Sequence, residues 1–270
     1  MIIYFSGAGN SHHLALRLAQ LLGDRAVSME SLWEEHSPKI ELRAHEDLGF
    51  VMPVHFGGMP AFVHDFMAQM EVRHAMDAPL YIYGLVTFGA SVGEWEKQFR
   101  DAVHACGLEA TATFPVKMVD TYVPLFDVTN TEKNNKILKQ AEELIPRIAE
   151  SIRKKAVCLQ NETNGRKMNN GKMPHWMAKW QYKYYERARR TKRFSVEPPA
   201  CRHCGACAAN CPTRCIEMRT DELLPVWTKE KCTLCLRCLH HCPAHAIRLG
   251  RNSKKHGQYP GPTGTKDTEE

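Results

Sequence analysis

Eight of the eleven cysteines form two copies of one four-cysteine unit between residues 201 and 242. Each unit has three cysteines with two residues between neighbours, then a fourth cysteine after three more residues, followed directly by proline. In such a run the first three thiolates bind one [4Fe–4S] cluster and the fourth binds the other cluster. The spacing predicts two clusters, one held by Cys201, Cys204, Cys207 and Cys242 and the other by Cys232, Cys235, Cys238 and Cys211.

Structural zinc is the alternative, because pairs of cysteines two residues apart also suit a tetrahedral zinc ion. Zinc would need only two such pairs for each ion. It gives no reason for the third cysteine of each unit or for the repeated Cys-Pro. We therefore favour iron–sulfur clusters, whose chemistry is one-electron transfer.

Residues 197–250 resemble the two-cluster bacterial ferredoxins, through both cysteine units and the Ala246-Ile247 pair after the second Cys-Pro. Such ferredoxins usually carry alanine where this chain has Cys215. That ninth thiol is predicted to be a buried substitute for alanine rather than a ligand. Cys106 and Cys158 lie far from the two units and are predicted to be small buried apolar residues.

A second motif follows the first apolar run of the chain, and it reads Ser6-Gly7-Ala8-Gly9-Asn10-Ser11. Glycines let the backbone approach an anion, hydroxyl and N–H groups donate to it, and the dipole of a following helix favours its charge. The motif is not the dinucleotide pattern, because His12 stands where a third glycine belongs, and it lacks the lysine of a P-loop. It predicts a phosphate site that does not hold a nucleoside triphosphate.

Two later glycine-rich loops follow predicted strands, at the carboxyl ends where open α/β sheets bind ligands. The residues predicted to contribute to the site are Pro53, Val54, His55, Phe56, Gly57 and Gly58 in the first loop and Thr87, Phe88, Gly89 and Gly93 in the second.

The phosphate motif and these two loops resemble the FMN site of flavodoxins. The resemblance implies that residues 6–11 hold the FMN phosphate and that the later loops flank the isoalloxazine, with His55, Phe56 and Phe88 in contact. Ala8 departs from the flavodoxin pattern, in which threonine is usual at this position. The missing hydroxyl weakens one phosphate contact by about 1 kcal/mol.

Apolar runs predict strands at residues 2–5, 26–29, 49–55, 80–88 and 110–118. Helical periodicity between them predicts helices around residues 14–22, 62–70, 95–103 and 137–152, the last one kinked at Pro146. Strands that alternate with helices predict an α/β fold with a flavodoxin-like, doubly wound, five-stranded parallel sheet. A small α+β ferredoxin domain is expected to follow it.

The predicted domains are a flavodoxin-like FMN domain at residues 1–157, a basic and aromatic linker at 158–197, the ferredoxin domain at 198–250 and a tail at 251–270. In the linker, a helix is predicted to dock one apolar stripe, with membrane-surface attachment as the alternative. The stripe consists of Met173, Trp176, Met177, Trp180 and Tyr184. The basic run Lys183, Arg187, Arg189, Arg190, Lys192 and Arg193 is interpreted as a solvated face, with an acidic protein partner as the alternative.

The order of these parts resembles the flavodoxin–ferredoxin fusion proteins of anaerobic bacteria and archaea known as the EFR-type family. The segment Gly257-Gln-Tyr259-Pro260 resembles the tail of that family. The resemblance implies electron transfer between the clusters and FMN and on to a redox partner protein. Two other hypotheses stay open: an FMN-dependent reductase of a small molecule such as a quinone, with His55 as proton donor, and a redox sensor or nucleic-acid-binding module.

Composition fits a globular chain, with 43% hydrophobic and 24% charged residues and a net charge of +6. No apolar segment approaches the roughly 20 residues of a membrane span, and the N-terminus does not resemble a secretory signal. We therefore expect a cytoplasmic protein with reduced cysteines. The sequence has no nucleic-acid-binding signature, so no nucleic-acid partner is expected. Whether the protein forms a homodimer is left open. The histidines His12, His13, His240 and His241 are predicted to be exposed.

Overall fold

The computed structural model describes residues 1–33, 38–74, 80–158, 175–221 and 223–262. Five strands form a parallel sheet: β1 (Ile2–Tyr4), β2 (Ala26–Ser28), β4 (Leu48–Pro53), β6 (Ile82–Phe88) and β7 (Ala112–Lys117). Their order is β2-β1-β4-β6-β7, so numbering these five along the chain gives 2-1-3-4-5. This is the flavodoxin-like order of a doubly wound sheet. The predicted fold is therefore confirmed, and all five predicted strands are present.

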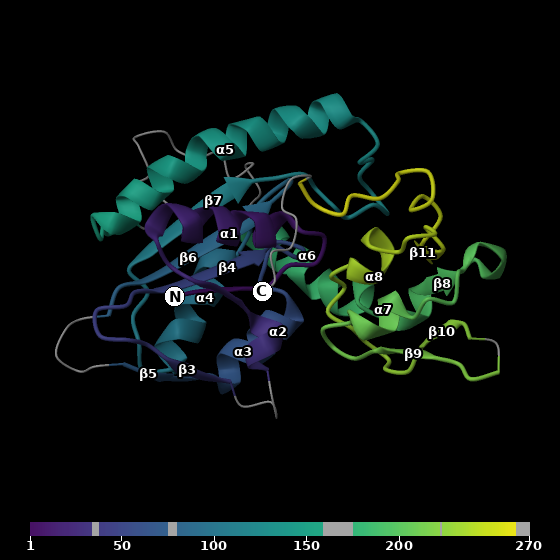
Figure 1. Ribbon diagram of the computed structural model, residues 1–270, viewed down its shortest axis with the longest axis horizontal. Coiled ribbons are helices and arrows are strands. Elements are labelled where there is room, and N and C mark those ends of the chain that lie inside the picture. The colour runs from purple at the N-terminus through teal and green to yellow at the C-terminus, as the bar shows by residue number, and fades with distance from the viewer. Residues whose placement is uncertain (34–37, 75–79, 159–174, 222, 263–270) are drawn as a thin grey trace.

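Helices cover both faces of the sheet (Figure 1). Helices α1 (Asn10–Leu22) and α5 (Thr131–Arg153) pack on one face, and α3 (Ala61–Gln69) and α4 (Trp95–Ala105) pack on the other. Successive strand residues point to opposite faces, so Ile2 joins the core under α1 and α5 whereas Ile3 joins the core under α3 and α4. Burial on both faces explains why the strands read as continuous apolar runs.

Three short elements were not predicted: α2 (Met29–Leu32), and a separate parallel pair formed by β3 (Lys39–Glu41) and β5 (Glu71–Arg73). Each strand of this pair has a single apolar residue between two charged ones, which is too short a pattern to detect in the sequence. Helix α5 runs through Pro146 to Arg153. None of the described helices is both long enough and apolar enough to cross a membrane.

The cysteine-rich part is a small α+β unit beside the sheet (Figure 1). Strand β8 (Phe194–Val196) pairs antiparallel with β11 (Ile247–Leu249), and β9 (Ile216–Met218) with β10 (Pro225–Trp227). Two short helices, α7 (Ala206–Ala209) and α8 (Arg237–His240), each carry the third cysteine of one unit. Two 3₁₀ turns, Thr191–Arg193 and Pro198–Ala200, lead into this part. The predicted small α+β fold is therefore confirmed.

Helix α6 (His175–Ala188) joins the two parts and contacts both of them. The Tyr182 hydroxyl donates to the Met59 carbonyl at 3.1 Å, and the Tyr185 hydroxyl donates to the Thr233 carbonyl at 2.7 Å. The predicted docking stripe is wrong in its described members, because Trp180 is 70% exposed and Tyr184 is 45% exposed. The helix docks through its tyrosine face instead, where the hydroxyls of Tyr182 and Tyr185 donate to carbonyls of both parts.

Residues 161–172 of the predicted linker, Met173 and the side chains of Trp176 and Met177 lie outside the part that the structure describes. Within the basic run, Arg189 departs from the predicted solvated face. Its side chain is 20% exposed, and its Nε donates to the Cys232 carbonyl at 2.8 Å.

Candidate functional site

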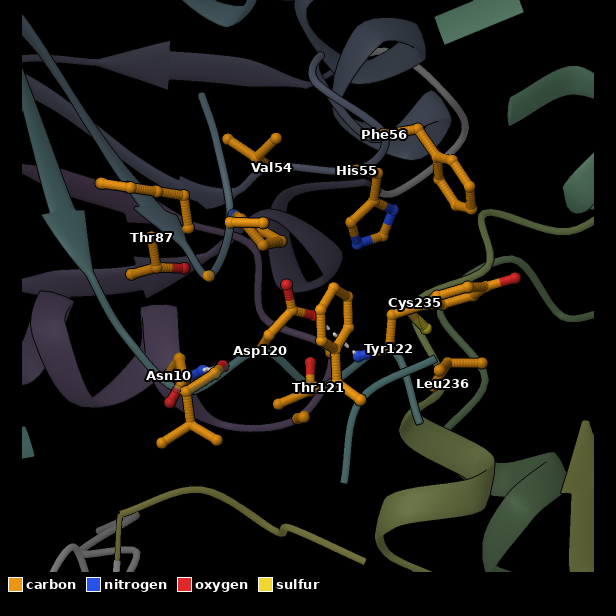
Figure 2. Close-up of a pocket in the computed structure, with 18 of the residues that line it drawn as sticks. Asn10, Val54, His55, Phe56, Thr87, Asp120, Thr121, Tyr122, Cys235 and Leu236 are labelled. Carbon is orange, nitrogen blue, oxygen red and sulfur yellow. Dashed lines mark hydrogen bonds between the residues drawn. The ribbon is translucent and has the colours of Figure 1, made fainter. Parts of the chain in front are cut away.

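A cavity of about 170 Å³ opens at the carboxyl ends of β1, β4, β6 and β7, between the sheet and the cysteine-rich part (Figure 2). Its position is the one that doubly wound sheets use for ligands. The predicted site residues that line it are Ser6, Gly7, Ala8, Asn10, Ser11, Pro53, Val54, His55, Phe56, Gly57, Thr87, Phe88 and Gly89. Three loops that are far apart in the sequence therefore meet around one space.

The other three predicted site residues, Gly9, Gly58 and Gly93, lie behind this lining and hold its loops together. A Cβ atom on Gly93 would lie 2.3 Å from the Gly57 carbonyl oxygen, and one on Gly58 would lie 2.4 Å from the Tyr182 ring. A Cβ atom on Gly9 would lie 2.7 Å from the Cα of Gly261 in the C-terminal tail. These positions need glycine because backbones and rings approach too closely for any side chain.

The phosphate motif forms the turn between β1 and α1. The Ser6 hydroxyl accepts a hydrogen bond from the Gly9 N–H at 3.1 Å, and the Ser11 and Thr87 hydroxyls lie 2.8 Å apart. The Asn10 side-chain amide donates to the Val119 carbonyl at 2.9 Å, and its buried Oδ1 has no partner among the residues that the structure describes. The described lining contains no lysine or arginine, so an anion here would be held by hydroxyls, N–H groups and the α1 dipole.

His55 enters the cavity from a tight turn (Figure 2). The N–H of His55 and that of Gly58 each donate to the other residue's carbonyl, at 2.9 and 3.0 Å. Phe56 and Gly57 between them have φ values of 50° and 77°, as a type I′ turn requires. This turn places the imidazole Nδ1 at 3.1 Å from the Thr233 carbonyl, to which it donates.

Burial lowers the pKa of His55 to about 4, so the imidazole is neutral at pH 7. Because Nδ1 carries the proton that the Thr233 carbonyl accepts, Nε2 is left unprotonated. At neutral pH the Nε2 atom of His55 can therefore accept a hydrogen bond but cannot donate one. The reductase hypothesis needs it as a proton donor, and the geometry does not favour that role.

Sequence reasoning missed the loop after β7, which lines the cavity with Val119, Asp120, Thr121, Tyr122, Leu125 and Phe126. Asp120 faces Gly89, where a Cβ atom would lie 2.3 Å from the carboxyl group. Its carboxylate accepts from the Tyr122 N–H at 3.1 Å, and burial raises its pKa. The rule that located the first two loops applies equally here, because this loop also follows a parallel strand at its carboxyl end.

The eight repeated cysteines surround two smaller cavities in the two sets that their spacing predicts. Cys201, Cys204, Cys207 and Cys242 line one, together with apolar residues such as Val196 and Ile247. Cys211, Cys232, Cys235 and Cys238 line the other, together with Phe194 and Trp227. Among the described residues, no three His, Cys, Asp or Glu side chains converge on a single point as ligands of one ion would.

Backbone N–H groups donate to several of these sulfurs. The N–H of Cys215 donates to Cys211 Sγ, and the N–H of Ala246 donates to Cys242 Sγ, both at 3.3 Å. Burial raises the pKa of Cys235 to about 11, so a bound metal would be needed to keep that sulfur a thiolate. The cysteine sulfurs can thus act as metal ligands, at sites that are partly shielded from water.

Cys215 occupies the place in the first unit that Ala246 occupies in the second, and each is 1% exposed. Its sulfur lies 3.0 Å from the Thr213 hydroxyl. The prediction of a buried alanine substitute is confirmed as far as burial goes. Cys106 and Cys158 are half-buried and pack against the two cores of the sheet.

Comparison with known proteins identifies the cysteine-rich part. Residues 200–246 match the model of the 4Fe-4S dicluster domain family. No curated protein matches the chain. The chain thus combines a flavodoxin-like sheet with a segment that matches the dicluster ferredoxin family, and we call this arrangement the fusion.

Two solved structures are similar to this chain at low identity. Rubredoxin oxygen:oxidoreductase from the anaerobe Desulfovibrio gigas is 18% identical with a TM-score of 0.33, covering 57% of this chain and 36% of that one. A flavodoxin from the domain Archaea is 14% identical with a TM-score of 0.32, covering 56% of this chain and 96% of that one. The fusion thus spans about a third of the length of the first of these proteins.

The two parts of the fusion meet at the phosphate motif. A Cβ atom on Gly7 would lie 2.2 Å from the Cys235 carbonyl oxygen, so the loop and the second cysteine set are in direct contact. The Thr233 hydroxyl accepts from the Phe62 N–H at 3.2 Å, which adds a contact with α3. Cys235 lines both the larger cavity and the cavity of the second cysteine set. No cysteine of the first set is among the described residues that line the larger cavity, and Cys204 is exposed.

His240 joins three segments of the fusion, and the prediction that it is exposed is wrong, because only 2% of it is exposed. Its Nε2 donates to the Thr121 carbonyl at 2.8 Å, and its Nδ1 accepts from the Tyr259 N–H at 3.1 Å. Of the other three histidines, His12 and His13 are half-buried and His241 is exposed. Burial overrides the polar character of His240 because both ring nitrogens find backbone partners.

The burial of His240 predicts a loss of stability in mild acid. Burial lowers its folded-state pKa to about 4, whereas the unfolded chain takes up the proton near pH 6.5. The unfolded state therefore binds more protons as the pH falls from about 6.5 towards 4, and the free energy of unfolding falls over that window. Between pH 7.5 and pH 5.5 we expect this residue to account for a loss of about 1.4 kcal/mol.

Anaerobic urea denaturation followed by circular dichroism at both pH values measures this loss. The variant His240→Gln keeps a donor and an acceptor but does not titrate, so its stability should depend less steeply on pH. An identical pH dependence in the variant and the parent would contradict the prediction.

Proposed function

We propose that this fusion transfers electrons between two [4Fe–4S] clusters and FMN, and on to a redox partner protein. The observation that carries the proposal is the shared position of Cys235, which lines both the cavity assigned to FMN and the cavity of the second cysteine set. When bound, the clusters supply one-electron steps and the flavin supplies one- or two-electron steps. A shared wall between the two sites leaves a short path for the electron.

The fit to FMN rests on the cavity and its donors. Hydroxyls and N–H groups gather at the start of α1, where a phosphate is favoured without a basic residue. Asn10 Oδ1 is a buried acceptor with no partner in the described part of the chain, as suits a ligand with hydroxyl groups. Aromatic residues Phe56, Phe88 and Tyr122 line the remaining wall, where a flat ring system would pack. We assign FMN to this cavity.

The fit to two clusters rests on the cysteine sets. Each set surrounds its own cavity, and three sulfurs of the eight accept backbone N–H groups at 3.3 Å. Cys204 in the first set is exposed, whereas Cys235 in the second faces the FMN cavity. We therefore propose that a partner protein exchanges electrons at the first set, and that they pass through the second set to the flavin.

The proposed organisation keeps the predicted parts: an FMN domain at residues 1–157, a linker at 158–197, a ferredoxin domain at 198–250 and a tail at 251–270. In it, the tail contributes to the domain contact. Gln258 donates to the carbonyls of Leu239 and Cys242 in the ferredoxin domain at 2.6 and 2.9 Å, and Gly261 packs against Gly9 of the FMN domain. Thiolate ligands need a reducing compartment, so we propose the cytoplasm as the location.

The test is anaerobic purification with iron, sulfide and flavin measured on the same sample. We expect about eight irons and about eight sulfides with one FMN. Photoreduction with a deazaflavin donor should then bleach the cluster absorption and the FMN absorption in the same preparation. Iron and sulfide without flavin would contradict the assignment of FMN to the cavity, and flavin without iron would contradict the two clusters.

A further inference from the structure

Arg237 places a cation at the wall of the second cysteine cavity. Of the described residues that line this cavity, Arg237 alone carries a formal charge, since the others are cysteines, apolar residues and threonines. Its neighbours in the sequence are Leu236 and the ligand Cys238, and its Nη1 donates to the carbonyl of Asn210, the residue before Cys211, at 3.3 Å. The guanidinium therefore touches both chain segments that supply this cysteine set.

The partner of Arg237 comes from the other domain. Its Nη2 is ion-paired with Glu30 in α2 and also donates to the Ser6 carbonyl of the phosphate motif at 2.5 Å. The side chains of Arg237 and Glu30 are 21% and 22% exposed. The second carboxylate oxygen of Glu30 is buried and has no protein partner among the described residues. Each charge of this pair therefore depends mainly on the other, in a setting where solvent screens them weakly.

Other charges near the second set are balanced within one domain or lie farther away. Arg189 donates to the Cys232 carbonyl, but its ion pair is with Glu186, three residues earlier in the chain. Beside the first set, Arg202 lines the cavity and is exposed, so water screens its charge. Among the described residues, the pair of Arg237 and Glu30 is thus the ion pair beside the second set that joins the two domains.

We propose that Arg237 is a positioning residue that favours electron residence at the second cysteine set, and that Glu30 moderates this effect across the domain contact. The inference rests on the proposed function, since it concerns one of the two proposed clusters. Reduction adds one electron, and hence one negative charge, to the site inside the second set, while the donor inside the first set is oxidised by one electron. A cation at the wall stabilises the added charge, and an anion beside that cation opposes it.

Two single variants should move the midpoint potential of the second site in opposite directions. Glu30→Gln leaves the guanidinium uncompensated, so the potential should rise. Arg237→Gln removes the cation and leaves the carboxylate, so the potential should fall. In each case we expect a change of about tenfold in the ratio of reduced to oxidised sites at a fixed potential, which corresponds to about 59 mV for one electron.

The measurement is the electron paramagnetic resonance signal of the reduced iron–sulfur protein at a series of fixed potentials, which gives the midpoints of both sites. Arg237→Lys keeps the charge and should leave the midpoint near that of the parent. Arg202→Gln is the matched control beside the first set, and it should leave the second midpoint unchanged. If Arg237→Gln loses iron, Glu30→Gln carries the test alone.

Opposite shifts in the two single variants support the inference. Unchanged midpoints, or shifts of the same sign in Glu30→Gln and Arg237→Gln, would overturn it, because a purely structural role has no reason to reverse the sign. The readout needs no flavin, so missing or unreduced FMN would count against the proposed function without affecting this test. Iron content measured on each variant shows separately whether the clusters are present.

Discussion

Replacing Cys235 by alanine is expected to leave about four irons where the parent holds about eight, and to stop electrons from reaching FMN. Cys235 is a ligand of the second cluster in the proposed scheme, and a cluster with three thiolates in a partly open cavity is labile. The same residue also lines the FMN cavity. Its loss therefore removes the step that connects the clusters to the flavin, while the first cluster stays accessible to a partner.

The measurement combines iron and sulfide content with the rate of FMN bleaching after a reductant is added through a ferredoxin-type donor. We expect that rate to fall at least about a hundredfold, because even a small misplacement of reacting groups can cost that much. Cys215→Ala is the matched control, because Cys215 is a buried cysteine that neighbours the second set and stands where the second unit has Ala246. It should keep about eight irons. An equal loss of iron from both variants would make Cys215 a ligand and would contradict the assignment of the second set.

Replacing Gly7 by alanine is expected to separate the two domains locally and to weaken FMN binding more than tenfold. The added Cβ atom would lie 2.2 Å from the Cys235 carbonyl oxygen and 3.1 Å from its carbonyl carbon. Both partners are backbone atoms, so neither can rotate away, and overpacking of this kind costs about 1–3 kcal/mol. Relief requires the phosphate motif to move, and that motion disturbs the donors at the start of α1.

Titration of the flavin-free protein with FMN, followed by the quenching of flavin fluorescence, measures the affinity. Gly107→Ala is the control, because Gly107 has a φ of 74° but no atom within 4 Å of an added Cβ. That variant should lose about 1–2 kcal/mol of stability from backbone strain and should keep its FMN affinity. A Gly7→Ala variant with parental affinity would show that the loop tolerates displacement and that the domain contact does not support the flavin site.

The sequence predicted those features that local chemistry dictates. The strands of the sheet are continuous apolar runs because both faces are covered, so all five could be located before the structure was known. The division of the cysteines into two sets follows from their spacing, because a short loop can surround only part of a cluster. Glycines and hydroxyls after the first strand likewise indicated a phosphate site where the structure has a cavity.

Contacts between distant segments were beyond sequence reasoning. His240 was expected at the surface, because a lone histidine gives no sign that the carbonyl of Thr121 and the N–H of Tyr259 will meet its ring. Trp180 and Tyr184 were expected to dock, but their helix buries Tyr185, whose hydroxyl reaches the Thr233 carbonyl. In both cases the choice depends on buried polar groups of another segment, and periodicity along one helix contains no information about them.

The sequence by itself determined the residue sets of the candidate sites in this chain: two sets of four cysteines, and a glycine- and hydroxyl-rich turn predicted to bind phosphate, on a flavodoxin-like sheet. Only the tertiary structure decided how they are connected. It brings the second cysteine set against the phosphate motif, with Cys235 in the wall of both cavities. It also pairs Arg237 with Glu30 across the domain contact. The physical reason is that spacing along the chain fixes local geometry, whereas the packing of one domain on another depends on surfaces assembled from many separate segments.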